Sequence, residues 1–547
     1  MSRRPGWVGA LVLALPTSAL AAPAAISLSQ SAPAVEALDF VEVTLSLREP
    51  DAANPFTDAA VTGWFAKADA KDKVAVEGFC DSAAGDLFRV RFTPSSPGSY
   101  TYEVTYRQGA FEKTFRGAFR ATDGRRRGPI RADPAYPWHF IWEGTGEHYF
   151  FNGTTAFWLM GWRDERHIRF SIDRLQKLKV NRIRTLLAGN ANLFWGDAVM
   201  TAASFTMALR PWPAEAPRSL ENPGLDFTRF DVPYWQKYER MLRFARDRDV
   251  IVSVILDIST HSAQPAAGSE DERRYYRYAI ARLAPFSNVT WDLGDDLDSF
   301  RDEKWTHETG TFLHERDPYK RLATSHPAHR GPQDRASAWF GFTSIQDWSR
   351  AQHALMLEER QIQMKTGRII PQANEEYGYE DHYPAWAPAP PGNSAETLRR
   401  VAWEIAMAGA YGTAGESARR GTNVWPDTGG GWINGRGDDT MVMLRGYAHM
   451  VEFFTSFDWW KTEPHDELVD QGAYCLAKPG EIYAVYLPRA GEVTVRAEPG
   501  RYEATWFDAF TGDTVPLGGE VSVSGPSWTS PKAPGWNDWA LLLRRRP

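Results

Sequence analysis

Acidic residues gather directly after two apolar stretches of this sequence, and their spacing suits one kind of chemistry. In the stretch at 287–300, apolar residues alternate with polar ones up to Gly294, and Asp295 and Asp296 follow. The stretch at 368–380 ends in NEEYGYE, which contains Glu376. Two carboxylates that face each other can cleave a glycosidic bond, because one protonates the leaving oxygen while the other attacks or activates water. Asp296 and Glu376 are our candidates for such a pair.

The sequence between these acids explains how residues 80 positions apart could meet. Stretches typical of strands alternate with helical patterns, which predicts an α/β fold, a (β/α)8 TIM barrel over residues 135–465. The functional residues of such a barrel lie at the carboxyl ends of its strands. A doubly wound sheet is the alternative, but no Gly-rich dinucleotide loop supports it. The eight strand candidates are 148–161, 181–189, 250–259, 288–294, 321–327, 340–348, 368–380 and 409–417.

Both flanks of the barrel contain short alternating runs that predict β-sandwiches. Residues 27–121 include FVEVTLSL and SYTYEVTYR, separated by Pro and Gly turns, and predict an N-terminal Ig-like β-sandwich. Residues 470–547 predict a small C-terminal β-sandwich. Cys80 and Cys475 are the only cysteines in the sequence. This number excludes a disulfide framework or a Cys-rich zinc site, and the spacing does not imply that the two cysteines pair.

Residues 1–22 are typical of a bacterial signal peptide, with a basic start, a short apolar run and an Ala-x-Ala ending near Ala22. The apolar run is too short for a membrane anchor, and no later stretch reaches membrane-spanning length. We therefore expect a secreted or periplasmic protein without a membrane span.

Charge and aromatic content narrow the class of partner. Lys and Arg number 62 against 69 Asp and Glu, and no basic block stands out in the interior. The resulting net charge of −7 argues against nucleic acid as a partner. The chain holds 23 Trp, 20 Tyr and 29 Phe. Such rings stack on sugars, although a large core with β-rich modules explains the excess equally well. The oligomeric state is not indicated.

Further residues near the predicted strand ends could bind a carbohydrate substrate. Arg184 could hold the charge of a nucleophilic carboxylate or form a scaffold salt bridge. Asp257 and His261 resemble half of a metal site, but such residues more often contact substrate hydroxyls, and we expect no metal or other cofactor. The remaining candidates at the predicted barrel mouth are Trp158, Asp295, His326, Trp348, Tyr377 and Trp425.

Several segments resemble one enzyme family. YYRYAIARLAPFSNVTWDLGDDLD is similar to the helix–strand segment of secreted apiosidase-like glycoside hydrolases of the clan A barrel type, and IIPQANEEYGYE resembles their seventh strand. NPFTDAAVTGWF, VEGFCD and RVRFTPSSPGSYTYEV resemble the Ig-like module of such proteins, and the C-terminal sandwich resembles their collagen-binding-like module. The resemblance implies a cofactor-independent, retaining glycoside hydrolase with Asp296 as acid/base and Glu376 as nucleophile.

The chain also differs from that family in residue type at three matched positions. Asp295 stands where the family usually has Asn, Asp296 where many relatives have Glu, and Thr154 where relatives often have Asp. The alternative is therefore a catalytically inactive carbohydrate-binding or adhesion protein on the same scaffold. Acids at both rim positions favour the enzyme, because a purely binding barrel does not require them. An adjacent Asp295 would raise the pKa of Asp296, as suits a proton donor. Because Asp is one methylene shorter than Glu, a wider gap between the carboxylates would change retention to inversion, and the sequence leaves both outcomes open. The sugar, its linkage and exo or endo action are not readable from the sequence.

Overall fold

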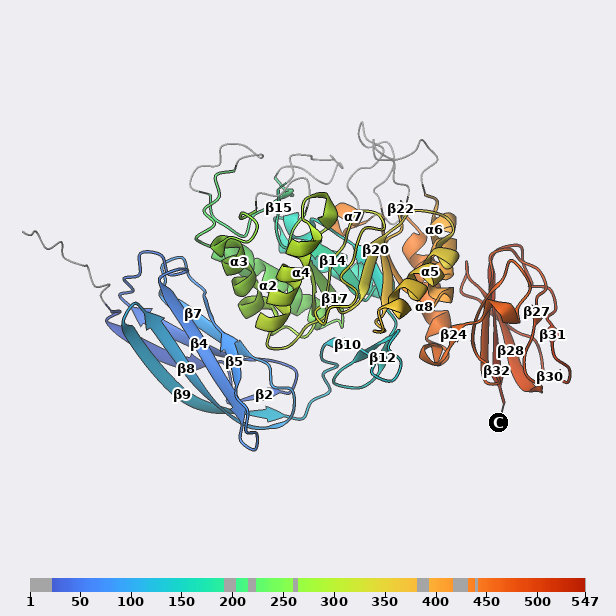
Figure 1. Ribbon diagram of the computed structural model, residues 1–547, viewed down its shortest axis with the longest axis horizontal. Helices are drawn as coiled ribbons and strands as arrows, with labels where there is room; N and C mark the ends of the chain where they lie inside the picture. Colours follow the sequence, from blue (N-terminus) through green and yellow to red (C-terminus); the bar gives the residue numbers. More distant parts are fainter. Residues whose placement is uncertain are drawn as a thin grey trace, which may run out of the picture.

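The computed structural model describes residues 22–190, 203–214, 223–258, 264–380, 393–416, 431–437 and 441–546. Three modules follow one another along the long axis of the molecule, with the N-terminal sandwich and the C-terminal sandwich on opposite sides of a central barrel (Figure 1). The predicted fold class is confirmed. His261, Trp425 and nearly all of the predicted signal peptide lie outside the described residues.

The central module is a parallel barrel whose strands correspond to the eight predicted stretches. Their order in the sheet is β19-β18-β17-β14-β13-β23-β21-β20. The ring closes where the Gly341 N–H donates to the Ala323 carbonyl (2.7 Å), next to a parallel bridge between Ala323 and Phe340. A short strand, β22 (Tyr379–Glu380), pairs with the end of β23. The barrel strands are β13 (Asn152–Thr155), β14 (Arg182–Leu186), β17 (Ile251–Ile255), β18 (Val289–Asp292), β19 (Ala323–Thr324), β20 (Thr343–Gln346), β21 (Gln372–Glu376) and β23 (Tyr411–Glu416).

Helices cover the outside of the barrel (Figure 1). In α1, Ile168, Ile172 and Leu175 are buried at helical spacing, so one face packs on the sheet. Ser269 caps α3 by accepting a hydrogen bond from the Glu272 N–H. No helix in the described part of the chain has the length and apolar character needed to cross a bilayer. The helices are α1 (Glu165–Lys177), α2 (Val232–Arg246), α3 (Glu270–Leu283), α4 (Glu303–Arg316), α5 (Gln352–Lys365), α6 (Ala395–Met407), α7 (Gly431–Asn434) and α8 (Met443–Phe454).

The N-terminal module is a sandwich of two sheets, ordered β1-β3-β7-β6 and β2-β9-β8-β4-β5. The alternation read in the sequence is its physical basis: Val41, Val43 and Leu45 of β3 face the core, while the residues between them are more exposed. Its strands are β1 (Ala25–Gln30), β2 (Ala34–Glu36), β3 (Val41–Arg48), β4 (Ala59–Lys67), β5 (Val74–Glu77), β6 (Phe79–Cys80), β7 (Leu87–Phe92), β8 (Gly98–Gln108) and β9 (Phe111–Thr122).

The C-terminal module is built on a seven-stranded antiparallel sheet, with a two-stranded sheet beside it. Cys475 of this module and Cys80 of the N-terminal module are both buried free thiols. The seven-stranded sheet contains β24 (Glu463–Pro464), β25 (Tyr474–Lys478), β26 (Ile482–Leu487), β28 (Gly500–Asp508), β29 (Thr514–Pro516), β30 (Val521–Val523) and β32 (Trp539–Arg545). The small sheet pairs β27 (Thr494–Val495) with β31 (Trp528–Thr529). Outside both sandwiches are β10 (Ile130–Ala132), β11 (Phe140–Trp142) and β12 (His148–Tyr149), which form one sheet, and the pair β15 (Gly189–Asn190) and β16 (Ala208–Leu209).

A buried ion-pair network joins the N-terminal sandwich to the barrel. Arg91 of β7 donates to both carboxylate oxygens of Glu239 on α2 (2.8 and 2.9 Å), and Arg282 of α3 donates to the same carboxylate (2.7 Å). Burial alone would raise the pKa of Glu239, but the two guanidinium groups outweigh it and lower that pKa to about 2. The carboxylate therefore remains ionised and links the two modules.

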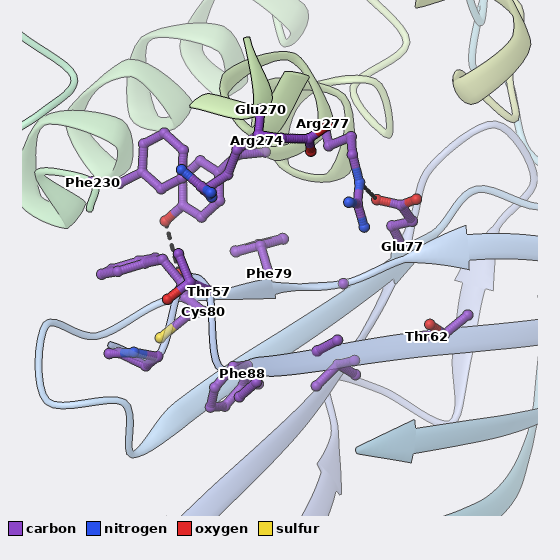
Figure 2. Close-up of a pocket in the computed structure, with 17 residues that line it drawn as sticks. Thr57, Thr62, Glu77, Phe79, Cys80, Phe88, Phe230, Glu270, Arg274 and Arg277 are labelled. Carbon is purple, nitrogen blue, oxygen red and sulfur yellow. Dashed lines mark hydrogen bonds and ion pairs between the residues drawn. The ribbon is translucent and has the colours of Figure 1, made fainter. Parts of the chain in front are cut away.

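A cavity of about 300 Å³ lies at the same junction (Figure 2). Phe79 and Cys80 of the sandwich and Arg277 and Tyr278 of the barrel line it. Arg277 Nε donates to the Glu77 carboxylate (2.7 Å), and the Tyr278 hydroxyl donates to the Cys80 carbonyl (2.7 Å). These polar groups hold the two modules together, and the candidate acids do not line this cavity.

Candidate active site

Arg184 of β14 lies at the centre of the acidic residues in the barrel mouth. Its Nη2 donates to Asp295 Oδ1 (3.0 Å) and to Asp292 Oδ2 (3.2 Å), and its Nη1 is 4.0 Å from Glu376 Oε2. Arg184 and Asp292 are fully buried, and Asp295 and Glu376 are nearly so. A guanidinium in a water-poor interior stabilises the ionised form of each nearby carboxyl. Arg184 therefore contacts acids from both candidate strand ends.

A bulge in β21 directs two consecutive acids into the barrel. Ile345 pairs with Asn374, but the next residue, Gln346, pairs with Glu376, so Glu375 is the extra residue. Normal alternation would send Glu375 and Glu376 to opposite faces, whereas a bulge re-aims side chains. The Asn374 side chain lies outside the barrel, and its carboxamide oxygen accepts a hydrogen bond from the Glu376 N–H (3.2 Å).

The Glu376 carboxylate has several polar neighbours. Gln346 Nε2 donates to its Oε1 (2.9 Å). Burial raises the pKa of Glu376 to about 7, and the negative charge of Asp296 contributes to the shift. Arg184 and hydrogen bonds from Tyr379 and Trp348 oppose it. These donors favour the ionised carboxylate, which is the form that can attack carbon.

The Asp295–Asp296 turn is fixed by the strands on either side of it. The Asp295 N–H donates to the Asp257 carbonyl at the end of β17 (3.1 Å), and the His326 N–H beyond β19 donates to the Gly294 carbonyl (3.2 Å). Asp296 has a left-handed backbone with φ of +51°. This conformation is uncommon for a residue with a Cβ and occurs often at functional sites. It directs consecutive side chains of the turn differently: Asp295 is buried and Asp296 is half-buried.

Both aspartates of the turn have altered acidity. Burial raises the pKa of each carboxyl, that of Asp295 well above its ordinary range, although Arg184 acts in the opposite direction on both. The charges of Asp296 and Glu376 raise the pKa of Asp295 further. Both strand ends therefore contribute carboxyl groups that affect one another's protonation, as a proton donor and its partner must.

His326 lies between the two strand ends. Its Nδ1 is hydrogen bonded to the Ser344 hydroxyl (2.9 Å), and its Nε2 lies 3.7 Å from Asp295 Oδ1 and 3.8 Å from Glu376 Oε2. Burial lowers the pKa of His326 well below its ordinary value, so the ring is neutral. Possible ligand atoms of these three residues lie within 4.8 Å of one another. A cation bound there would have to compete with the Arg184 guanidinium for both carboxylates.

Two regions of the chain match known families. Residues 187–416, which run from the end of β14 to the end of β23, match the family described as "Apiosidase-like, catalytic domain". The match spans the barrel from β17 to β23, so this part of the chain is similar to that catalytic domain. This match indicates that the chain is a glycoside hydrolase. Residues 34–107, within the N-terminal sandwich, match a domain of unknown function, DUF5060. No curated protein sequence matches the chain.

Solved structures share the fold of this chain. A Bacteroides vulgatus protein named as a glycoside hydrolase is 20% identical, with a TM-score of 0.77, and the match covers 94% of this chain and 100% of that one. A glycoside hydrolase family 5 protein from the same organism is 15% identical, with a TM-score of 0.60 and coverage of 77% and 94%. At these sequence identities, the similarity to both structures shows a shared fold.

The other predicted site residues of the barrel have different surroundings. Asp257 is buried and ion-paired with Arg301 (3.1 Å). The Trp158 indole N–H donates to the Met207 carbonyl (3.0 Å). The Tyr377 ring is buried near Tyr447 of α8, away from Glu376. The structure therefore brings together Arg184, Asp295, His326 and Glu376, and Trp348 lies half-buried beside them.

Arg182 and Tyr379 of this site were not among the sequence candidates. Arg182 of β14 pairs with Glu375 in the barrel interior and donates to the Ser253 hydroxyl (2.7 Å). The alternation of Arg182 and Arg184 along one strand was a signal that both face inward. Tyr379 stacks on Trp432, with ring centroids 5.0 Å apart. Their contact joins segments that are distant in the chain, so local sequence held no signal for it.

Proposed function

We propose that the chain is an exported, retaining glycoside hydrolase with Glu376 as nucleophile and Asp296 as acid/base. Glu376 would bond to the anomeric carbon while the glycosidic C–O bond breaks, and the Asp296 proton would pass to the leaving oxygen. Asp296 would then take a proton from water, whose oxygen displaces Glu376. The observation that carries the proposal is the Glu376 carboxylate, held by Gln346 Nε2 (2.9 Å) beside the Asp295–Asp296 turn.

Asp296 suits the role of proton donor better than Asp295. Asp295 is buried and holds a hydrogen bond from Arg184 (3.0 Å). Asp296 is half-buried, so a leaving group and water can reach it. Its raised pKa favours the protonated form that donation requires.

The assignment is tested with Glu376→Gln and Asp296→Asn on a panel of nitrophenyl glycosides and plant, algal and bacterial polysaccharides. A nitrophenolate leaves without protonation, so Asp296→Asn should still release a first burst of nitrophenol, while its turnover of polysaccharide falls about 10²–10⁴-fold. Glu376→Gln should abolish both reactions. Glu308→Gln on α4, whose side chain is 64% exposed, is the matched control. Nuclear magnetic resonance of the first product should show the anomer of the substrate.

Three results would count against the proposal. Full turnover by both variants would remove the assigned pair. A first product of opposite anomeric configuration would replace retention by inversion. Binding of glycans without cleavage of any would favour the inactive carbohydrate-binding protein.

Export is tested separately. The protein recovered from the periplasm or medium of a bacterial host should have lost its first residues, with the new N-terminus near Ala22. Retention of the intact chain in the cytoplasm would contradict this part of the proposal.

A further inference from the structure

Among the residues that the structure describes, the interior of the barrel mouth contains more buried acids than buried cations. Four carboxyl groups are buried together there, and two guanidinium groups accompany them. His326 is the other titratable base among them, and it is neutral because burial lowers its pKa. Uncompensated charge is very unfavourable in a buried site, and such a cluster therefore binds protons. The carboxyl groups are those of Asp292, Asp295, Glu375 and Glu376, and the guanidinium groups are those of Arg182 and Arg184.

The hydrogen bonds distinguish these carboxyl groups. Glu375 pairs with Arg182 and accepts from the Thr413 hydroxyl (3.2 Å). Asp292 accepts from Arg184 and from the Gly294 N–H (3.2 Å). Such donors stabilise ionised carboxylates.

Asp295 has less support for a negative charge. In the described part of the chain, its carboxyl group accepts one hydrogen bond, on Oδ1 from Arg184 Nη2, and that nitrogen is shared with Asp292. Oδ2 therefore has room for a proton. The groups that face Asp295 are Arg184 from β14, Asp292 from β18, Asp296 from its own turn, His326 beyond β19, Glu376 from β21 and Tyr379 from β22. Arg184 is the one cation in this described set, and the other charged members are acids.

We propose that Asp295 is protonated in the resting enzyme and acts as a neutral hydrogen-bond donor beside Glu376. It is thus a positioning residue: its proton stays on Oδ2 and is not transferred. The catalytic part of this inference rests on the proposed function, whereas the protonation state does not. Burial and the neighbouring acids both raise the pKa of Asp295, which favours its protonated form.

The protonation state can be measured without a substrate. A carboxyl whose pKa is raised by folding contributes stability below its unfolded pKa, near 4, and loses that contribution as pH rises through the folded pKa. The amide of Asp295→Asn does not titrate. As pH rises from 4 to 8, urea unfolding should therefore show that Asp295→Asn becomes more stable relative to the wild type. The ratio of the two unfolding equilibrium constants should change by up to about tenfold per pH unit.

The opposite slope, or none, would overturn the inference, because it would mean that Asp295 is ionised in the fold. Glu308→Gln, on the exposed face of α4, should show little pH-dependent difference. If the Asp295→Asn protein does not fold, Asp295→Ser, whose side chain is neutral and smaller, provides the same measurement.

Kinetics test the role as donor. Asp295→Asn retains an N–H donor and should lose no more than about tenfold in kcat/KM, whereas Asp295→Ala should lose about a hundredfold. Above the pH at which Asp295 ionises, the wild type should lose activity faster than Asp295→Asn. If Asp295→Asn is as inactive as Glu376→Gln, the donor role is wrong. If the wild type cleaves no glycoside, the proposed function fails, and the unfolding experiment still decides the protonation state.

Discussion

Replacing Arg184 by Met would test whether this residue keeps Glu376 ionised. Arg184 Nη1 lies 4.0 Å from Glu376 Oε2, and Arg184 is fully buried. At that distance, and with the effective dielectric constant of a protein site, the attraction between two unit charges is about 4 kcal/mol. This energy corresponds to about three pKa units. Because the pKa of Glu376 is already about 7, losing the cation should leave the carboxyl protonated at neutral pH.

The assay is the pH profile of kcat/KM on an activated aryl glycoside. The nucleophile must be ionised, so activity is lost as pH falls through the pKa of Glu376. Arg184→Met should move this acid limb upward by one to three pH units and lower kcat/KM at pH 7 by about 10- to 1000-fold, the smaller value applying if water fills the vacated space. Arg184→Lys keeps the charge and should shift the limb much less.

Folding must be compared in parallel, because removing one partner of a buried pair destabilises a protein. Circular dichroism and urea unfolding of both variants provide this comparison. Arg240→Met, which removes an ion pair to Glu165 from a 55% exposed side chain, should change neither the profile nor the fold. An acid limb at the wild-type position in a folded Arg184→Met protein would refute the reasoning.

Four further outcomes are expected. Gln346→Leu removes the donor 2.9 Å from Glu376 Oε1, so kcat/KM should fall about tenfold and its acid limb move to higher pH; an unchanged profile would contradict this. Asp296→Asn removes a charge that raises the pKa of Glu376, so the limb measured on an activated substrate should move to lower pH rather than higher. Glu239→Gln removes the carboxylate that two buried guanidinium groups share, although Arg91 keeps its pair with Glu42 and Arg282 its pair with Asp81. Urea unfolding should therefore show a loss of stability of up to about 3–5 kcal/mol, and a loss below about 1 kcal/mol would contradict this. Tyr377→Phe should change kcat/KM little, because this ring lies away from Glu376; a loss comparable to that of Gln346→Leu would instead place Tyr377 at the substrate.

The sequence determined the architecture because its signals are local. Alternating runs of period two mark β3, and the helical spacing of Ile168, Ile172 and Leu175 marks α1. Eight such strands in βα order predict a barrel, and a barrel gathers the carboxyl ends of strands four and seven at one mouth. The acids at 295–296 and 376 were therefore recognisable before any contact was known.

The tertiary structure alone decided the direction of each acidic side chain. Asp295 and Asp296 are neighbours of the same type, and their different exposure follows from the left-handed backbone at Asp296 and from hydrogen bonds of the turn to the Asp257 and His326 backbones. Likewise, a bulge in β21 turns Glu375 and Glu376 to the same side, where alternation predicts opposite sides. These directions depend on hydrogen bonds between strands far apart in the chain, and no local pattern of residue types encodes them.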